Sequence, residues 1–341
     1  MADPPGVDTA ALRAYLDRDR PGLVDGTIKA DLIPGGRSNL TYVVTDGAGE
    51  WVLRRPPLGH VLATAHDMAR EFRVMTALAP SGVPVPATLL LCQDDTVIGA
   101  PFYVMEKVDG AVLRSPAEVV AVLTREQARE LSFTLVDVLA GLHAVDIESV
   151  GLADFGRPQG YLERQVRRWA GQLDKSRSRD LPGIDDLHDR LRDSVPPTER
   201  DTIVHGDFRL DNVIIGVDGP DRDVRAVLDW EMSTLGDPLA DLGLLVVYWQ
   251  TLMAQAGATE ENGFASTGEI VAHYGERTGL DLSTVDWYVA FGFYKLAVVA
   301  EGIYFRHTKG KTVGEGFERF ATMVAPLVEQ GLDALTRTQE R

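Results

Sequence analysis

The sequence predicts an α+β protein with a small N-terminal lobe built on an antiparallel sheet and a larger, mainly helical C-terminal lobe. Short strand-like runs separated by turn residues fill the first third of the chain, whereas segments with helical spacing of apolar residues fill most of the rest. The length of 341 residues is enough for two lobes, each with its own core. We therefore expect residues 1–107 to form the first lobe and residues 108–341 the second.

Charge and composition restrict the classes of partner. Hydrophobic residues make up 45% of the chain and charged residues 25%, which is ordinary for a globular protein. There are 34 basic residues against 51 acidic ones, so the formal net charge is -17. A nucleic-acid groove needs a basic face that neutralises phosphates, and we therefore expect no nucleic-acid partner.

Cysteine usage and the N-terminal segment favour a cytoplasmic protein. Cys92 is the single cysteine, which excludes an intramolecular disulfide and fits a reducing compartment. The first residues, MADPPGVD, lack the basic and apolar regions of a signal peptide. No uninterrupted apolar run approaches the ~20 residues that span a bilayer, so we expect no membrane partner.

The first lobe is predicted to hold two helices and five strands. Thr9–Asp19 and Ala65–Leu78 have apolar residues at helical spacing, and Met68, Phe72 and Met75 line one face of the second segment. Turns rich in glycine, proline and aspartate separate the strand-like runs. These runs are Ile28–Ile33, Leu40–Val44, Glu50–Arg55, Thr88–Cys92 and Pro101–Met105.

Helices dominate the prediction for the second lobe. Residues 174–200 are rich in charge, proline and serine, so we expect a mobile or loosely helical connection there. The loop 256–268 is expected to act as a lid over the substrate. The predicted helices are Glu126–Val145, Gln159–Leu173, Leu242–Met253, Glu269–Gly279 and Ser283–Arg306.

The residues that can carry out a reaction are concentrated in the segment 203–243. Asp207 and Asn212 lie in a loop that follows a short apolar run, and a predicted hairpin brings Asp229 back after two strand-like segments. Phosphoryl transfer requires a carboxylate that accepts or orients the hydroxyl proton, together with oxygen ligands for magnesium. These three side chains supply that set.

The order of these residues resembles a known family. His205–Asn212 matches the catalytic loop H-x-D-x-x-x-x-N of kinase folds, in the H-G-D form of aminoglycoside and choline-type phosphotransferases. The blocks HGDFRLDN, VLDWE and GDPLADLG are most similar to the branch also found fused to acyl-CoA dehydrogenases. The resemblance implies a two-lobed, protein-kinase-like fold that uses ATP and Mg²⁺. It also implies that Asp207 orients the acceptor hydroxyl, while Asn212 and Asp229 hold the metal.

Three neighbouring residues are expected to have supporting roles. Asp237 before Pro238 fits a helix N-cap followed by proline at the first helical position. Asp241, one turn later in an apolar setting, is expected to brace the catalytic loop. His205 is expected to form structural hydrogen bonds, because the motif places the proton acceptor at Asp207.

The resemblance also implies a nucleotide site in the first lobe. Gly35–Asn39 is similar to a phosphate-binding loop, with Ser38 as the contact, although it lacks the three-glycine spacing of kinases. Val52 and Met105 would be apolar walls of the adenine pocket. The backbone of the hinge, Glu106 to Val108, would contact the adenine edge.

A basic residue on the third strand is expected to hold the α- and β-phosphates. Strand alternation puts Arg54 on the face of Val52, where the family has lysine, and Glu71 lies where the family's helix offers a glutamate to that residue. Arginine is not equivalent to lysine, so this is a departure from the pattern. A bulge would exchange Arg54 with Arg55, and that alternative stays open.

The resemblance implies that the acceptor is a small molecule with a hydroxyl group. The dehydrogenase-fused branch suggests a hydroxyacyl-CoA or a hydroxy acid; an aminoglycoside is the second choice, and a nucleotide-binding pseudokinase is a rival. ATP versus GTP and the oligomeric state, including a homodimer, stay open. The candidate acceptor-lining residues are Tyr248, Trp249, Lys295, Glu301, Tyr304 and Arg306.

Overall fold

The computed structural model describes residues 3–33, 39–58, 67–219, 222–310 and 316–340, and for residues 338–340 it describes the backbone alone. The chain divides into two compact units. Unit 1 comprises Met1–Ala111 and Val213–Glu231, and unit 2 comprises Val112–Asn212 and Met232–Arg341.

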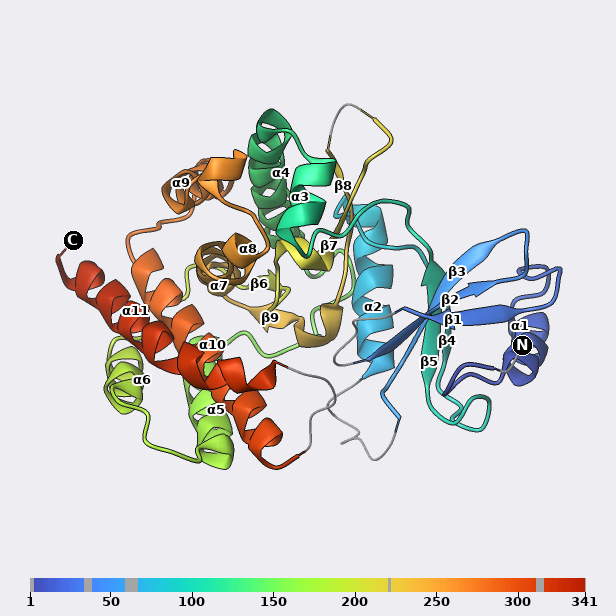
Figure 1. Cartoon of the computed structure of the whole chain (residues 1–341). Coiled ribbons are helices and arrows are strands. Elements are labelled where there is room, and N and C mark those ends of the chain that lie inside the picture. The colour runs from blue at the N-terminus through green and yellow to red at the C-terminus, as the bar shows by residue number, and fades with distance from the viewer. Residues whose placement is uncertain (1–2, 34–38, 59–66, 220–221, 311–315, 341) are drawn as a thin grey trace. The chain divides into compact units, whose positions relative to one another are not determined.

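Unit 1 is built on a five-stranded antiparallel sheet with the strand order β1-β2-β3-β5-β4 (Figure 1). A second, two-stranded sheet pairs β7 with β8. The strands are β1 (Lys29–Leu32), β2 (Leu40–Thr45), β3 (Glu50–Arg55), β4 (Thr88–Cys92), β5 (Phe102–Glu106), β7 (Val213–Ile215) and β8 (Val224–Val227). The helices are α1 (Thr9–Asp19), α2 (Met68–Leu78) and the short 3-10 turn Ala79–Ser81.

The two faces of the five-stranded sheet carry different chemistry. Leu12 and Leu16 of α1 are buried in one cluster with Tyr42, Leu53 and Val104 of the sheet. The opposite face, which α2 covers, alternates with these positions and carries the polar group described below. The sheet therefore has an apolar face for stability and a second face that can hold a charged site.

The β7–β8 hairpin belongs with unit 1, which differs from the predicted division at residue 107. Ala111 forms a bridge with Ile215, and the Val227 amide donates to the carbonyl of Pro84 at 2.8 Å. These bonds join segments that lie more than a hundred residues apart in sequence, so no local pattern indicated them. Asp229 is consequently in unit 1, whereas Asp207 and Asn212 are in unit 2.

Unit 2 is mainly helical, so the expected α+β class is confirmed for the chain. Its short strands β6 (Thr202–Val204) and β9 (Thr234–Gly236) pair antiparallel. The 3-10 turns are Leu210–Asn212, Trp230–Met232 at the boundary of the units, Glu260–Asn262 and Phe317–Arg319. The helices are α3 (Pro116–Val122), α4 (Arg125–His143), α5 (Tyr161–Ser176), α6 (Ile184–Asp193), α7 (Pro238–Gln250), α8 (Leu252–Gln255), α9 (Thr267–Thr278), α10 (Val285–Thr308) and α11 (Phe320–Glu340).

The centre of unit 2 is the pair α7 and α10, with α11 packed along α10 (Figure 1). Among the described residues, α10 is the one helix that is long and apolar enough to cross a membrane by length and composition. Lys295 and Glu301 lie within it, so it is not an uninterrupted apolar run. Of its most apolar segment, 72% is buried inside the protein, as in a core helix.

Several segments of unit 2 differ from the prediction, which also contained no helix at Pro116–Val122. Residues 174–200 contain the regular helix α6, whose Leu187 and Leu191 are buried. The helix has few apolar residues, and the many charged residues around them obscured the helical pattern in the sequence. Helix α11 was not predicted. The loop 256–268 is not a free lid, because Phe264 and Ala265 are buried and the Ala265 amide donates to the Ser132 hydroxyl at 3.1 Å.

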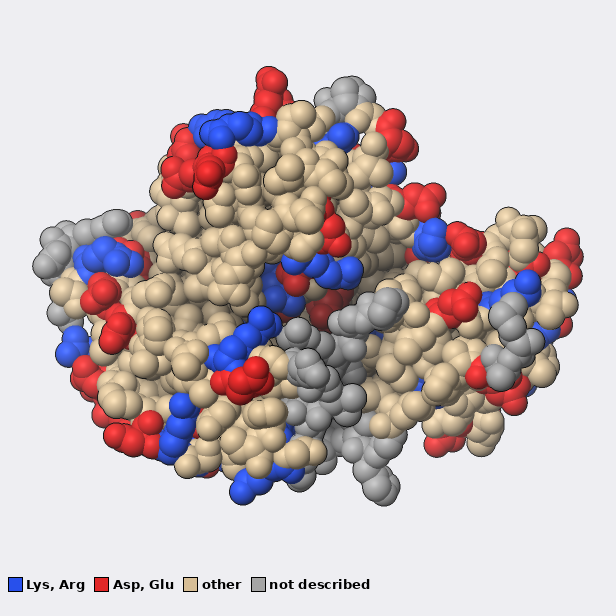
Figure 2. Space-filling model, viewed as in Figure 1, with Lys and Arg blue, Asp and Glu red and all other residues tan. Residues whose placement is uncertain are grey.

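Charged side chains are mixed on the surface. Figure 2 shows acidic and basic side chains interspersed on the face in view. Most ion pairs among the described residues lie at partly or fully exposed positions, where each contributes little to stability.

At Gly243, helix α7 lies very close to the backbone of α10. A Cβ atom at this position would lie 2.4 Å from the carbonyl carbon of Tyr288, which is backbone and cannot rotate away. We expect Gly243→Ala to lower the free energy of unfolding by about 2 kcal/mol through overpacking. Gly141→Ala in α4 is the matched control, since its Cβ would meet no heavy atom within 4 Å. The control should raise stability by about 0.5–1 kcal/mol in urea unfolding.

Candidate active site

In unit 1, an ion-pair cluster surrounds Arg54. Its Nε lies 3.0 Å from the Glu71 carboxylate of α2, so the pairing predicted from the sequence is present. Its Nη2 donates to the Asp229 carboxylate and lies 4.0 Å from that of Glu231. The Arg54 side chain is 13% exposed. One guanidinium thus joins β3, α2 and the segment after β8.

Glu71 is the most buried acid of this cluster. Tyr103 donates its hydroxyl to Glu71 at 2.9 Å, and the Asn39 amide donates to the other carboxylate oxygen at 2.9 Å. Burial raises the pKa of Glu71 to about 7, although Arg54 and the Tyr103 hydrogen bond oppose the rise. Glu71 is therefore fixed by β3, by β5 and by the residue that precedes β2.

Arg55 points to the opposite side of β3. It donates to the carbonyls of Gly6, Pro56 and Ile98, and it is 4% exposed. These backbone acceptors occupy its guanidinium. Of the two arginines, Arg54 is therefore the one placed among the functional candidates.

The remaining nucleotide-site candidates are distributed along the same sheet. Val52 and Met105 are cross-strand partners and are both nearly buried. Glu106 is exposed at the end of β5 and Val108 is half-buried in the following segment. Ser38 and most of the glycine loop lie outside the described residues; Asn39 is bound to Glu71 and Glu231.

Asp229 has an unusual backbone conformation. Its φ is 65°, and it is the only non-glycine residue with positive φ in the described part of the chain. Aspartate tolerates this left-handed region better than most residues, but it is still uncommon. Such local strain is found at functional sites, and here it directs the carboxylate toward Arg54.

In unit 2, Asp207 is held by hydrogen bonds from two elements. The Asn212 amide donates to its Oδ2 at 3.0 Å and to its carbonyl at 2.9 Å. The Tyr248 hydroxyl, from α7, donates to Oδ1. Because the Asn212 nitrogen is used within the loop, its amide oxygen is the atom that can ligate a cation.

The backbone of the loop 205–212, the candidate catalytic loop, is held by a carboxylate of α7. Asp241 accepts hydrogen bonds from the amides of His205 at 2.6 Å and Gly206 at 2.8 Å, as the sequence predicted. His143 Nε2 lies 3.3 Å from the same carboxylate. Burial alone would raise the pKa of Asp241, but the interactions with His143 and His205 hold it below its usual value. Asp237 caps α7 by accepting from the Leu239 amide.

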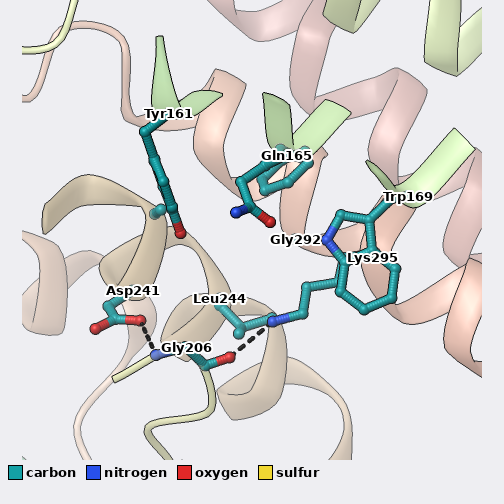
Figure 3. A pocket seen from close by; sticks show the side chains of 10 residues that line it. Tyr161, Gln165, Trp169, Gly206, Asp241, Leu244, Gly292 and Lys295 are labelled. Atoms are coloured by element: carbon teal, nitrogen blue, oxygen red, sulfur yellow. Dashed lines mark hydrogen bonds between the residues drawn. The ribbon is translucent and has the colours of Figure 1, made fainter. Parts of the chain in front are cut away.

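Lys295 holds the loop from another side. Its ammonium donates to the Gly206 carbonyl at 2.7 Å and lies 5.4 Å from the centre of the Trp169 ring. Figure 3 shows the ammonium directed at Gly206 with the Trp169 indole beside it, and Asp241 bound to the Gly206 amide. Burial lowers the pKa of Lys295, against the opposing effect of Asp207 and Asp241.

Two cavities of unit 2 share Trp169 in their lining, and the smaller also includes Gly206 of this loop. The smaller has a volume of about 20 Å³, room for one water, and lies between Tyr161, Gln165, Trp169 and Lys295 (Figure 3). The larger has a volume of about 270 Å³ and is called the arginine groove below. It is lined by Arg168, Trp169, Gln172, Met232, Val298, Val299, Gly302 and Arg306.

The structure separates the six acceptor candidates. Arg306 lines the arginine groove, Lys295 lines the smaller cavity and Tyr248 contacts Asp207. The other three are engaged elsewhere: the Trp249 indole donates to Ala265, Glu301 is fully buried and pairs with Arg179, and Tyr304 lies under the Arg179 guanidinium.

Sequence reasoning missed several lining residues. Arg168, Gln172 and Met232 carry no motif, and they converge because α5, α10 and the segment before β9 pack together. Arg209 is inside the recognised loop, where it lies 3.4 Å from Asp207 and 3.1 Å from Asp211. Its position in the motif was a signal that could have identified it.

The buried pair Glu71 and Arg54 leads to a prediction about pH and stability. A carboxyl whose pKa is about 7 when folded, against 4.5 when free, binds its proton more tightly in the folded state. Its stabilising contribution is complete below pH 4.5 and is lost as the pH rises through 7. Relative to Glu71→Gln, the ligand-free wild type should lose about 3 kcal/mol of unfolding free energy over that interval. Urea unfolding of both proteins measures this; parallel curves would contradict it.

Comparison with known proteins identifies the architecture. Residues 29–277 match a family model described as the phosphotransferase enzyme family. Acyl-CoA dehydrogenase family member 11 of Gallus gallus is 35% identical over 97% of this chain and 44% of its own length. Member 10 of Mus musculus is 34% identical over 89% of this chain and 29% of its own length. The chain thus spans less than half the length of these relatives.

Solved structures agree on the fold. A provisionally named aminoglycoside phosphotransferase from Ralstonia eutropha JMP134 superposes with a TM-score of 0.81 and 31% identity, covering 97% of this chain and 98% of its own. The GDP complex of aminoglycoside 2'-phosphotransferase-IIIa has a TM-score of 0.61 at 14% identity, covering 97% and 99% of the two chains. The second likeness shows the kinase-like fold alone.

Proposed function

Because this chain belongs to the phosphotransferase enzyme family, we propose that it transfers the γ-phosphoryl group of ATP to a hydroxyl of a small anionic molecule, a hydroxyacyl-CoA or a hydroxy acid. The observation that carries the proposal is the arrangement of Asp207, whose carboxylate is held by Asn212 and Tyr248 on a loop braced by Asp241. A carboxylate fixed in this way suits the orientation of an acceptor hydroxyl.

The proposed reaction uses Asp207 as the proton acceptor. The acceptor oxygen forms a bond to the γ-phosphorus as the bond from that phosphorus to the β-phosphate oxygen breaks. The hydroxyl proton passes to Asp207 late in the transfer, and ADP leaves. Lys295 and Asp241 keep the loop backbone in place during this step, since both bind Gly206.

The donor set fits a magnesium nucleotide. Asp229 offers a carboxylate and Asn212 an amide oxygen, and Mg²⁺ prefers a few such oxygen ligands together with substrate phosphates over a cage made of protein alone. When bound, the metal would neutralise charge on the phosphoryl oxygens. Arg54, fixed by Glu71, would bind the nucleotide phosphates. Solved neighbours of this fold include complexes with GDP and with AMP-PNP, which supports nucleotide use.

The arginine groove favours an anionic acceptor. Arg168 and Arg306 line it, and neither forms an ion pair with another residue in the described ranges. No carboxylate is among its lining residues, although the chain as a whole carries a net charge of -17. Trp169 lines both this groove and the cavity beside Gly206, so the two cavities are neighbours. A cationic aminoglycoside would meet two arginines there.

The relatives supply the acyl part of the proposal. Proteins named acyl-CoA dehydrogenases carry a segment similar to this chain, so a hydroxylated acyl compound is a chemically related acceptor. The groove combines its arginines with the apolar Met232, Val298 and Val299, which suits a molecule with a charged group and an aliphatic part.

The test is phosphate transfer from ATP with magnesium to a panel of hydroxyacyl-CoAs, hydroxy acids, choline and aminoglycosides. We expect phosphorylation of the anionic acceptors and its loss in Asp207→Asn. Transfer to an aminoglycoside alone would refute the acceptor class. ATP binding by calorimetry without transfer to any acceptor would favour the pseudokinase instead.

Charge reversal in the groove tests the acceptor site separately. We expect Arg168→Glu and Arg306→Glu each to raise the KM of the anionic acceptor at least about ten-fold, because a lost charge contact costs more than 1.4 kcal/mol. The KM of ATP should stay unchanged. Arg167→Glu, an exposed neighbour on α5 that does not line the groove, is the control. An equal effect of all three variants would point to general electrostatics.

A further inference from the structure

Tyr248 is a buried residue of α7 whose hydroxyl is bound to Asp207. It is 6% exposed and donates a short hydrogen bond to Oδ1 of Asp207, 41 residues away in sequence. We propose that Tyr248 is a positioning residue that orients the Asp207 carboxylate for phosphoryl transfer. The proposal rests on the proposed function, because it assigns Tyr248 a part in the step that Asp207 performs.

The direction of the hydrogen bond follows from chemistry. An ionised carboxylate only accepts, so the phenol must donate. Burial, followed by the nearby charge of Asp207, raises the pKa of Tyr248 well above its usual value. Tyr248 therefore stays protonated and cannot itself take the acceptor's proton. Its contribution is to hold the group that does.

The two oxygens of Asp207 are held from different elements. Tyr248 binds Oδ1 from α7, while Asn212 binds Oδ2 at 3.0 Å from within the loop. Arg209 Nε lies 3.4 Å from the same Oδ2. Donors on both oxygens restrict rotation of the carboxylate about its last side-chain bond. Without Tyr248, only the loop's own residues would determine the plane of the carboxylate.

Tyr248 also supports Arg209. The Arg209 guanidinium lies 5.4 Å from the centre of the Tyr248 ring, which is within the range of a cation–π contact. The ring contact would survive in Tyr248→Phe, whereas the hydroxyl bond would not. This substitution therefore isolates the positioning role from packing.

Two other buried tyrosines of unit 2 provide matched controls. Tyr288 forms the same kind of bond, since its hydroxyl donates to the Asp237 carboxylate at 2.9 Å, but Asp237 is a helix cap. The Tyr294 hydroxyl is buried and has no hydrogen-bond partner among the described residues. Both lie on α10, so Tyr288→Phe and Tyr294→Phe remove a phenol oxygen from the core without touching the catalytic loop.

The experiment measures steady-state and single-turnover transfer for wild type and the three phenylalanine variants, with thermal unfolding of each. We expect Tyr248→Phe to lower kcat and the single-turnover rate by at least about ten-fold, since misplacement of a catalytic group is costly. The KM values of ATP and acceptor should change by less than about two-fold, because ground-state binding is retained. The two controls should keep the wild-type kcat.

Each outcome bears on the proposal. If Tyr248→Phe lowers the melting temperature as Tyr288→Phe does but keeps the wild-type kcat, Tyr248 is structural and the inference is wrong, while the proposed function stands. A rise in KM with an unchanged kcat would make Tyr248 a substrate contact and also overturn it. A folded wild type that transfers phosphate to no acceptor removes the proposed function itself, and the inference with it.

Discussion

Asp207→Ala should lower turnover by about a thousand-fold or more, which is the size expected when the group that handles the acceptor proton is lost. The reason is local: no other carboxylate of unit 2 is held by both Asn212 and Tyr248 in the described structure. The measurement is phosphate transfer at saturating ATP and acceptor, with ATP binding by calorimetry on the same protein. We expect ATP affinity to remain close to that of the wild type.

Asp207→Asn is the matched variant for this result. It keeps the size of the side chain and removes the negative charge, so it should lose activity with less effect on folding. Retention of turnover in Asp207→Asn would show that the charge is not required, and the assignment of Asp207 as proton acceptor would be abandoned.

Asp229→Ala is expected to lower turnover by about a hundred-fold to a thousand-fold, since it removes charge stabilisation from the phosphoryl group. It also leaves Arg54 with one fewer carboxylate. The dependence of rate on magnesium concentration should shift to higher concentrations. Steady-state transfer across a magnesium titration measures both effects.

The backbone of Asp229 provides the control. Its φ of 65° is unfavourable for alanine by about 1 kcal/mol but unstrained for glycine. Asp229→Ala and Asp229→Gly should therefore be equally inactive, while Asp229→Ala alone carries the cost of strain in thermal unfolding. Near wild-type turnover in Asp229→Gly would contradict the metal-binding role.

Much of the secondary structure followed from local pattern. The bounds of Thr9–Asp19, Glu50–Arg55 and Thr88–Cys92 are those predicted, because apolar spacing and turn residues act over a few positions. The cap at Asp237 was also predicted, since a side chain bonds an amide two residues away. Helix α11 was not predicted, and the segment of α6 was predicted only as a mobile or loosely helical connection; both helices pack against α10.

For the candidate site, too, some residues could be predicted from local sequence and others depended on tertiary packing. The motif residues Asp207, Asn212 and Asp229 could be selected from the sequence because the loop and the hairpin are continuous segments. The choice between Arg54 and Arg55 could not, because it depends on which face of β3 meets α2. The prediction of the acceptor-lining residues was the least accurate, since a helix sequence does not reveal which residues line a cavity.

The sequence by itself determined the reaction family, the order of the elements and the identity of the chemical groups, because motifs and periodicity are properties of short segments. The tertiary structure decided which groups act on one another. Arg54 binds Asp229 across 175 residues, Tyr248 binds Asp207 across 41, and the groove arginines come from helices far apart in the chain. Such pairs form only when packing brings distant segments within hydrogen-bond distance, so no local pattern contains them.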